Sequence, residues 1–217
     1  DFCLSRGLGD VYKRQACWIN PDNDGEGDNG RIFYKGDPVE MYVNSESGSA
    51  MKVTFRHQFN TTNGRWDTTN RDIPINQWTH VAVTYNNSSD ANNAVIYING
   101  VSVALTEDSA PGGTRTTDAS YELKLGNKAE DRTFDGGMRD FRFYDYELSA
   151  DQASSLYSGS YNVTPTHWYR IDEGTGSTAT DEGTGTTTNG THGNVPTWDN
   201  GTPVSYTHLT LPTIYPV

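Results

Sequence analysis

The segment around Trp66 holds the residues of this chain best suited to binding a small polar ligand. Asn63, Arg65 and Asp67 lie within three positions of Trp66, in a stretch that the neighbouring Asn, Thr and Gly residues mark as a turn. An exposed indole can stack on the apolar face of a pyranose ring, while amide, guanidinium and carboxylate groups hydrogen-bond the ring hydroxyls. The candidate binding residues are therefore Asn63, Arg65, Trp66 and Asp67, with Tyr34 and Tyr42 as further aromatic rings.

The other tryptophans, a histidine and the cysteines fit structural roles better. Trp18, Trp78 and Trp168 lie in stretches with the alternation of β-strands, so we expect them in the core. His80 lies in a strand pattern and is expected to be a structural histidine. Cys17 is predicted to be a buried thiol, because Cys3 and Cys17 lack the spacing of a zinc site.

Motifs for catalysis are missing from the sequence. There is no GxSxG nucleophile elbow, HExxH zinc helix or phosphate-binding P-loop. Glycoside hydrolysis needs two carboxylates at a fixed separation across a cleft, whereas the acidic pairs here are adjacent residues in turn-like stretches: Glu130-Asp131, Asp172-Glu173 and Asp181-Glu182. We therefore predict that the protein is not an enzyme. Glycoside hydrolysis is a third hypothesis, which the missing carboxylate pair disfavours.

The charge balance argues against a nucleic-acid partner. The chain has 16 Lys and Arg against 28 Asp and Glu, a formal net charge of −12, and lacks the clustered basic residues that bind phosphates. An acidic surface suits divalent cations, neutral sugars or solubility alone. The acidic loop DNDGEGDN (22–29) lacks the glutamate that closes an EF-hand loop, so we expect a solvated, glycine-rich loop there. No apolar run is long enough to predict membrane insertion.

Composition and hydrophobic patterning predict an all-β fold. Aromatic residues make up 12% of the chain and glycine occurs 22 times, which suits short strands joined by polar turns. Asn99-Gly100, between apolar runs, predicts a two-residue type I′ hairpin turn within 77–105. Ser149 is predicted to cap one short helix near 149–157. Further strands are predicted at 16–20, 31–35, 39–44, 51–59, 121–127 and 138–148.

Four segments, in this order, resemble the laminin-G-like jelly roll of the concanavalin A-like lectin/glucanase superfamily. They are the WINP strand followed by IFYKG, the WTHVAVTY and IYINGV hairpin, the LGN block before FDGG, and the strand-to-helix segment MRDFRFYDYELSADQ. The resemblance covers about residues 16–160 and implies a two-sheet antiparallel jelly-roll sandwich. It also implies calcium in some members, with Asp140 and Asp181 as the positions that carry over. The E-x-D-x-x-E motif of related laminarinase-type hydrolases is missing.

The resemblance suggests two functions for a non-catalytic domain. The first is an extracellular carbohydrate-binding or adhesion module of a larger multi-repeat surface protein, with a glycan or cell-surface polysaccharide as its partner. The second is a purely structural spacer repeat that has no ligand of its own. The sequons at Asn60, Asn87 and Asn162 would carry glycans only in a eukaryotic source.

The chain ends are predicted to lie outside the jelly roll of residues 16–160. Residues 1–15 and 204–217 resemble translated sequencing-adapter DNA and are expected to be non-native tails. The first strands of the family are missing before Ala16, whereas HWYRIDEGTGSTATDEGTG, starting at His167, resembles the opening of the family pattern. Residues 161–203 are therefore expected to open a second repeat. We hypothesise that residues 167–194 fold back onto the first domain, an idea to be rejected if Trp168 and Ile171 are solvent-exposed and unpaired.

Overall fold

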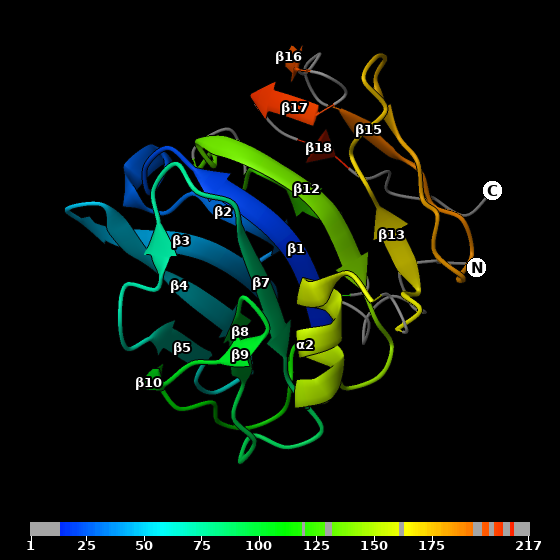
Figure 1. Cartoon of the computed structure of the whole chain (residues 1–217). Coiled ribbons are helices and arrows are strands. Elements are labelled where there is room, and N and C mark those ends of the chain that lie inside the picture. Colours follow the sequence, from blue (N-terminus) through cyan, green and yellow to red (C-terminus); the bar gives the residue numbers. More distant parts are fainter. Residues whose placement is uncertain are drawn as a thin grey trace.

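Alternate hydrophobic residues along the strands meet between two antiparallel β-sheets, which form a sandwich in the computed structural model (Figure 1). The structure describes residues 14–118, 120–128, 132–160, 163–192, 197–199, 202–205 and 209–210. The predicted all-β jelly-roll sandwich is confirmed.

One sheet has six strands, in the order β13-β12-β1-β7-β8-β9. The predicted type I′ turn joins β8 to β9, because Asn99 and Gly100 both have positive φ, 49° and 79°, and Ile98 pairs with Val101. This prediction is therefore confirmed. The strands are β1 (Arg14–Pro21), β7 (Thr79–Thr84), β8 (Val95–Ile98), β9 (Val101–Ser102), β12 (Gly136–Phe143) and β13 (His167–Tyr169).

The larger sheet has the order β10-β5-β4-β3-β2-β11-β18-β15-β14, with β6 paired to β4. Its first part comprises β2 (Arg31–Lys35), β3 (Val39–Ser47), β4 (Ala50–His57), β5 (Gly64–Thr68), β6 (Ile73–Pro74), β10 (Leu105–Ser109) and β11 (Lys124–Leu125). It continues through β14 (Thr178–Ala179), β15 (Gly190–His192) and β18 (Leu209–Thr210). A 3-10 turn, η2 (Glu26–Asp28), precedes β2, and β16 (Thr197–Asp199) pairs with β17 (Thr202–Ser205).

The core lies between the two sheets. Its side chains come from alternate positions of facing strands, such as Met41 and Phe55 in the larger sheet and Val81 and Val83 in the six-stranded sheet. Cys17 is 1% exposed, and this burial raises the pKa of its thiol, so the predicted buried cysteine is confirmed.

The helix α2 (Ala150–Ser158) packs on the outer face of the six-stranded sheet (Figure 1). The Ser149 hydroxyl accepts a hydrogen bond from Gln152 N at 3.2 Å, and the Gln152 side chain accepts one from Ser149 N at 2.9 Å. This reciprocal capping box satisfies two of the N–H groups that a helix start leaves unpaired. Leu156 and Ala153 pack with Ala82 in a second, smaller hydrophobic cluster. The predicted helix is confirmed.

A bulge at Asp140 interrupts the regular alternation of side chains along β12. Asp140 has φ 58°, and the register between β1 and β12 shifts between Ala16 and Trp18. As a result, Met138 and Phe141 both join the core although they are three positions apart.

Residues after α2 pack against the sandwich. Tyr169 pairs with Phe141 of β12, and Tyr169 and Ile171 are each 1% exposed. Of the two residues named for the fold-back hypothesis, Ile171 is buried, whereas Trp168 is half-buried and pairs with Arg142 of β12, so neither is both exposed and unpaired. Whether residues 161–203 open a second repeat stays a prediction.

The predicted tails lie mostly outside the described residues, which start at position 14 and end at position 210. Arg14 and Gln15, assigned to the first tail, are the first residues of β1, because Gln15 pairs with Val83 and Phe143. Leu209 pairs with Leu125, which places β18 beside β11. The domain boundaries otherwise stay predictions.

Candidate functional site

Four of the predicted binding residues lie on the outer face of the larger sheet. Tyr34 on β2, Tyr42 on β3, and Arg65 and Asp67 on β5 alternate with the core residues of their strands. Thr54 on β4 connects two of them, because it pairs with Tyr42 on one side and Asp67 on the other. The Thr54 hydroxyl also donates a hydrogen bond to the Asp67 carboxylate at 2.7 Å.

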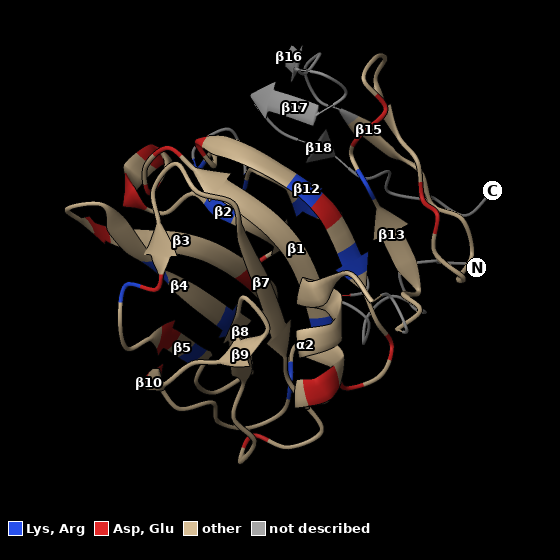
Figure 2. Cartoon of the chain, viewed as in Figure 1, with Lys and Arg blue, Asp and Glu red and all other residues tan. Residues whose placement is uncertain are grey.

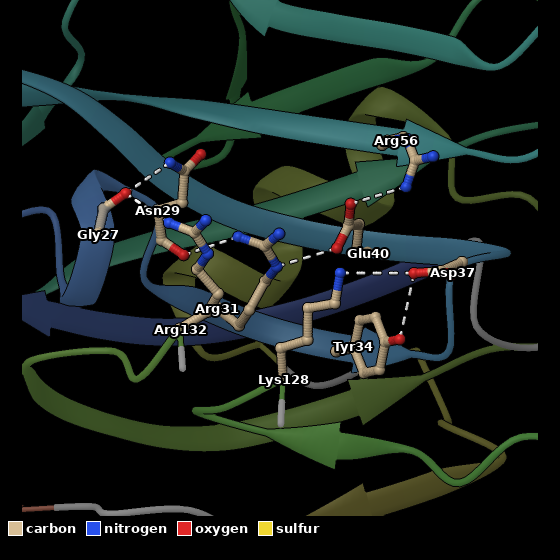
Figure 3. Close-up of polar contacts among 9 residues, drawn as sticks. All are labelled: Gly27, Asn29, Arg31, Tyr34, Asp37, Glu40, Arg56, Lys128 and Arg132. Carbon is tan, nitrogen blue, oxygen red and sulfur yellow. Dashed lines mark hydrogen bonds and ion pairs between the residues drawn. The ribbon is translucent and has the colours of Figure 1, made fainter. Parts of the chain in front are cut away.

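Glu40 is the centre of an ion network on this face that the sequence did not predict. Arg31 Nε donates to one carboxylate oxygen of Glu40 at 2.9 Å, and Arg56 Nη1 donates to the other at 3.0 Å (Figure 3). The Glu40 side chain is 4% exposed and that of Arg31 8%. These charge-assisted hydrogen bonds offset the cost of burying the carboxylate away from water. Glu40, Arg31 and Arg56 therefore form an ion network on the outer face of the larger sheet.

The loop 22–30 lies beside this ion network. Asp24 N donates to the Glu46 carboxylate at 3.1 Å, and Glu46 N donates to the Asp24 carboxylate at 3.0 Å, which ties the loop to β3. Arg31 and Arg132 donate from their Nη1 atoms to the carbonyls of Asn29 and Gly27, both at 2.7 Å (Figure 3). Much of the loop is solvent-exposed, as predicted for a glycine-rich solvated loop, and these bonds add that it is held in place.

The loop and the sheet enclose an open pocket of about 720 Å³. Its lining residues include Asp24, Asp28, Asn29, Asn44, Glu46 and Arg65. Arg65 is held in place by Asp67, to which Nε and Nη2 both donate at 3.1 Å. The pocket thus combines carboxylate and amide acceptors with amide and guanidinium donors in fixed positions. Of the residues predicted from sequence, only Arg65 lines it.

Trp66 does not have the exposed ring predicted for it. The residue is 1% exposed, because it lies in β5 and points into the core between Phe55 and Tyr85, whose ring centroids are 6.0 and 4.9 Å away. Its Nε1 donates to the Asn93 side chain at 3.0 Å, beside a smaller pocket of about 360 Å³. Asn63 is also engaged locally, because its side chain accepts from Phe59 N at 3.3 Å. The prediction for Trp66 is wrong because residues 64–68 form the strand β5, whereas the sequence pattern indicates a turn.

The two predicted tyrosines have rings covered by cations. Arg31 lies 4.3 Å from the Tyr42 ring centroid, and Tyr42 is 6% exposed. Lys128 lies 5.2 Å from the Tyr34 ring centroid, and the Tyr34 hydroxyl donates to Asp37 at 3.3 Å. Burial and the charge of Asp37 raise the pKa of Tyr34 to about 12. The Tyr42 ring is therefore closed to stacking, contrary to the prediction, because it is buried, whereas Tyr34 is half-buried and Lys128 covers part of its ring.

Asp140 and Asp181, the two expected calcium ligands, do not fit that ion. Asp140 accepts two hydrogen bonds from Arg142, at 2.9 and 3.0 Å, and one from Trp168 Nε1. Asp181 accepts from His167 Nδ1 at 2.6 Å and from three backbone N–H groups at 3.0 Å. Burial opposes ionisation of Asp181, but these bonds outweigh it and lower its pKa. Calcium needs several free carboxylate or carbonyl oxygens, which these two side chains do not offer.

The tryptophans predicted to be core residues lie on the surface of the six-stranded sheet. Trp18, Trp78 and Trp168 are each half-buried, whereas Trp66 is the buried one. Trp18 is opposite His80 in the register of β1 and β7, on the face that points away from the core. His80 is 2% exposed, and burial together with Arg142 lowers its pKa to about 4. Its predicted structural role agrees with this burial.

Fold and site together define a β-sandwich domain that carries a polar pocket on its larger sheet. A laminin G family model of the concanavalin A-like lectin/glucanases superfamily matches residues 15–154. The chain therefore belongs to this family, as the sequence resemblance predicted. A search of curated proteins found no match.

Three solved structures illustrate what the chain is similar to. The native heptameric SAP-like pentraxin from Limulus polyphemus is 16% identical, with a TM-score of 0.49 over 68% of this chain and 70% of that one. Domain 4 of AbnA, a GH43 extracellular arabinanase from Geobacillus stearothermophilus, in complex with arabinotriose, is 20% identical, with a TM-score of 0.44 over 66% and 65%. The Ruminococcus gnavus IT-sialidase CBM40 bound to α2,3 sialyllactose is 12% identical, with a TM-score of 0.45 over 66% and 81%. The family assignment rests on the match over residues 15–154.

Proposed function

We propose that the protein is a non-catalytic carbohydrate-binding module whose ligand occupies the pocket between the loop 22–30 and the outer face of the larger sheet. The observation that carries this proposal is the lining of the pocket, in which every residue except one glycine has a side chain that can form hydrogen bonds. Its volume of about 720 Å³ lies within the roughly 300–1,000 Å³ typical of small-ligand sites.

The chemistry of the lining suits sugar hydroxyls. Each hydroxyl both donates and accepts, so it pairs well with a carboxylate such as Asp28 on one side and an amide or guanidinium such as Asn29 or Arg65 on the other. These groups are held before a ligand arrives, because Arg65 is bonded to Asp67 and the loop is bonded to β3. Preorganised donors and acceptors lose little entropy on binding, which favours a specific polar ligand.

The same bonds argue against hydrolysis at this pocket. Asp24 and Glu46 each accept the backbone N–H of the other, so both carboxylates serve as fastenings of the loop. A glycoside hydrolase needs one carboxyl group to donate a proton and a second to act as base or nucleophile. We therefore propose binding without bond cleavage.

The setting that we propose is an extracellular surface protein with several such modules. The affinity of a single shallow polar site is modest, and repetition along one chain would raise it by avidity. No helix of the described segments has the length and apolar character that a membrane span requires.

A glycan array probed with the full-length chain, followed by calorimetric titration of the best ligand, tests the proposal. Asp28→Asn and Arg65→Gln should each weaken binding about tenfold, because each removes a charge-assisted hydrogen bond. Asn is a suitable replacement because Asp28 has φ 59°, a conformation that Asn tolerates. Asp151→Asn, the same change on α2, is the matched control and should leave affinity unchanged.

Three results would contradict the proposal. Absence of saturable binding to any glycan would favour the spacer function. Equal weakening by Asp151→Asn would show a non-specific charge effect. Shortening of the bound oligosaccharide over time, lost in Glu46→Gln, would favour a hydrolase.

A further inference from the structure

A patch of half-exposed aromatic rings lies on the outer face of the six-stranded sheet, on the opposite side of the sandwich from the pocket. It consists of Trp18 on β1, Trp78 just before β7, Arg139 on β12 and Tyr157 on α2, and we call it the aromatic patch. The Arg139 guanidinium carbon lies 4.3 Å from the Trp78 ring centroid and 5.7 Å from that of Trp18. The rings of Trp18 and Tyr157 are 5.7 Å apart. Three elements and the segment just before β7, all distant in sequence, thus contribute side chains that contact one another.

Strand register and one glycine create the aromatic patch. Trp18 is opposite Arg139 on β12 and opposite His80 on β7, so the three side chains form a row across the sheet. Gly100 allows α2 to approach, because a Cβ at this position would lie 3.1 Å from Tyr157 Cβ and 3.0 Å from Ser154 Cα. This approach places the Tyr157 ring, which is 42% exposed, against Trp18.

Arg139 differs from the other arginines of the described residues. For Arg139 the structure shows contacts with two indole rings, but no hydrogen bond or ion pair within the described part of the chain. Arg142, three positions along β12, is instead bonded twice to Asp140 (β12 carries these basic and acidic positions in Figure 2). In a chain with net charge −12, an arginine held between two indoles without a carboxylate is an unusual arrangement. It leaves the N–H groups of the guanidinium available to an anion.

The chemistry of the aromatic patch selects a ligand that is both a ring and an anion. A guanidinium binds a carboxylate through two parallel hydrogen bonds, and indoles stack on the C–H face of a pyranose. His80, the nearest other titratable base, lies beneath Trp18 at a ring distance of 5.3 Å and is neutral at neutral pH, because burial lowers its pKa to about 4. Arg139 is therefore the cation of the aromatic patch.

We propose that the aromatic patch is a second binding site, specific for a carboxylate-bearing pyranose such as a uronic acid residue. The pyranose ring lies against Trp78 and Trp18, and its carboxylate pairs with Arg139. This proposal is independent of the ligand in the pocket, because the two sites share no residue and lie on different sheets.

Titration of the full-length chain with oligomers of galacturonate, mannuronate and glucuronate tests the site, with tryptophan fluorescence and calorimetry as readouts. At least one oligomer should bind saturably, and its methyl ester, which keeps the ring and removes the charge, should bind at least about tenfold more weakly. Inorganic sulfate at equal concentration should not compete. Saturable binding of none of the oligomers, equal binding of the ester, or equal competition by sulfate would overturn the proposal.

Variants assign the binding to the aromatic patch. Arg139→Gln and Trp78→Ala should each weaken uronate binding about tenfold, and Arg139→Lys should bind with intermediate affinity because it keeps the charge without the two-pronged donor. Arg170→Gln, which makes the same substitution at an exposed position directly after β13, is the control. Asp28→Asn in the pocket should leave uronate binding unchanged. Unchanged affinity of Arg139→Gln, with a wild-type melting curve, would refute the proposal whether or not the pocket binds a glycan.

Discussion

Arg139 on one outer face of the sandwich and the arginines around Glu40 on the other have opposite surroundings. On the larger sheet, Arg31 and Arg56 share the buried carboxylate of Glu40, and Arg65 is bonded twice to Asp67. On the six-stranded sheet, Arg139 lies between Trp18 and Trp78 without a carboxylate among the described residues. The first face uses its charges to hold its own structure together, whereas the second presents a charge to the solvent.

This difference separates the roles of the two faces. Ion pairs with little exposure fix the shape of the larger sheet, so that its neighbouring pocket offers preorganised donors and acceptors to a neutral polar ligand. A guanidinium group that is stacked on aromatic rings is only weakly hydrated, so it loses little hydration free energy when it pairs with an anion. The comparison predicts that loss of the Glu40 network changes stability, whereas loss of the Arg139 charge changes binding.

Trp66→Ala should cause the largest loss. The side chain is 1% exposed and packs against Phe55 and Tyr85, so its truncation should lower the free energy of unfolding by about 4 kcal/mol through lost burial and a cavity. Trp78→Ala, on the aromatic patch, should cost less than about 1 kcal/mol because its ring is half-exposed. Urea denaturation of both variants measures this difference, and equal losses would remove the distinction between core and surface tryptophans.

The tryptophans also show what the sequence could and could not predict. Local patterns predict the strands at 31–35, 39–44 and 51–59, the Asn99-Gly100 turn and the capped helix correctly, because these depend on neighbours in sequence, but they indicate a turn where β5 lies. Which face of a strand an aromatic ring occupies depends on pairing register, and the bulge at Asp140 changes that register within β12. Trp18 therefore lies on the outer face although its strand was predicted correctly, whereas Trp66 lies in the core because residues 64–68 form a strand and not the predicted turn.

The candidate site depends even more on contacts between distant residues. Tyr34, Tyr42, Arg65 and Asp67 do share one face, as membership of alternating strands allows. The reciprocal bonds of Asp24 and Glu46 join residues 22 positions apart, and no local pattern announces them. Arg139 could not be singled out from the sequence either. Its distinguishing feature is that it has no carboxylate partner among the described residues, and that depends on the folded arrangement.

Glu40→Gln should cause the second-largest loss. Glu40 is 3% exposed, and the amide would leave Arg31 and Arg56 without a negative charge between them. Breaking such a buried ion pair costs at least about 3 kcal/mol of unfolding free energy. Glu147→Gln, at an exposed position, is the control and should cost less than about 0.5 kcal/mol. A Glu40→Gln variant as stable as the control would show that the network contributes no rigidity to the first face.

The buried His80 on the six-stranded sheet should make the free energy of unfolding depend on pH. Its pKa is about 4 in the folded protein, against an ordinary value of 6.5 in the unfolded chain, so between these values the unfolded chain binds the extra proton. Stability therefore falls as pH decreases from 6.5 to 4, by up to about 3 kcal/mol. The pKa of Asp181 is lowered from 3.8, so its contribution is lost only at lower pH. Urea denaturation across this range should show a smaller slope for His80→Gln, and an unchanged slope would contradict the assignment.

Gly100→Ala should lower stability only slightly, and it should weaken uronate binding at the aromatic patch without changing glycan binding at the pocket. Gly100 has φ 79°, so alanine costs about 1 kcal/mol for the backbone conformation alone. Gly176→Ala is the matched control, because Gly176 has φ 86° and nothing lies within 4 Å of its added Cβ. At Gly100 the new methyl group would also press on Ser154 and Tyr157 of α2, moving the Tyr157 ring away from Trp18. Uronate binding should therefore weaken in Gly100→Ala and not in Gly176→Ala, while glycan binding at the pocket stays unchanged in both. Equal uronate affinity in the two variants would show that Tyr157 is not part of the aromatic patch and would narrow the site to Arg139 and the two tryptophans.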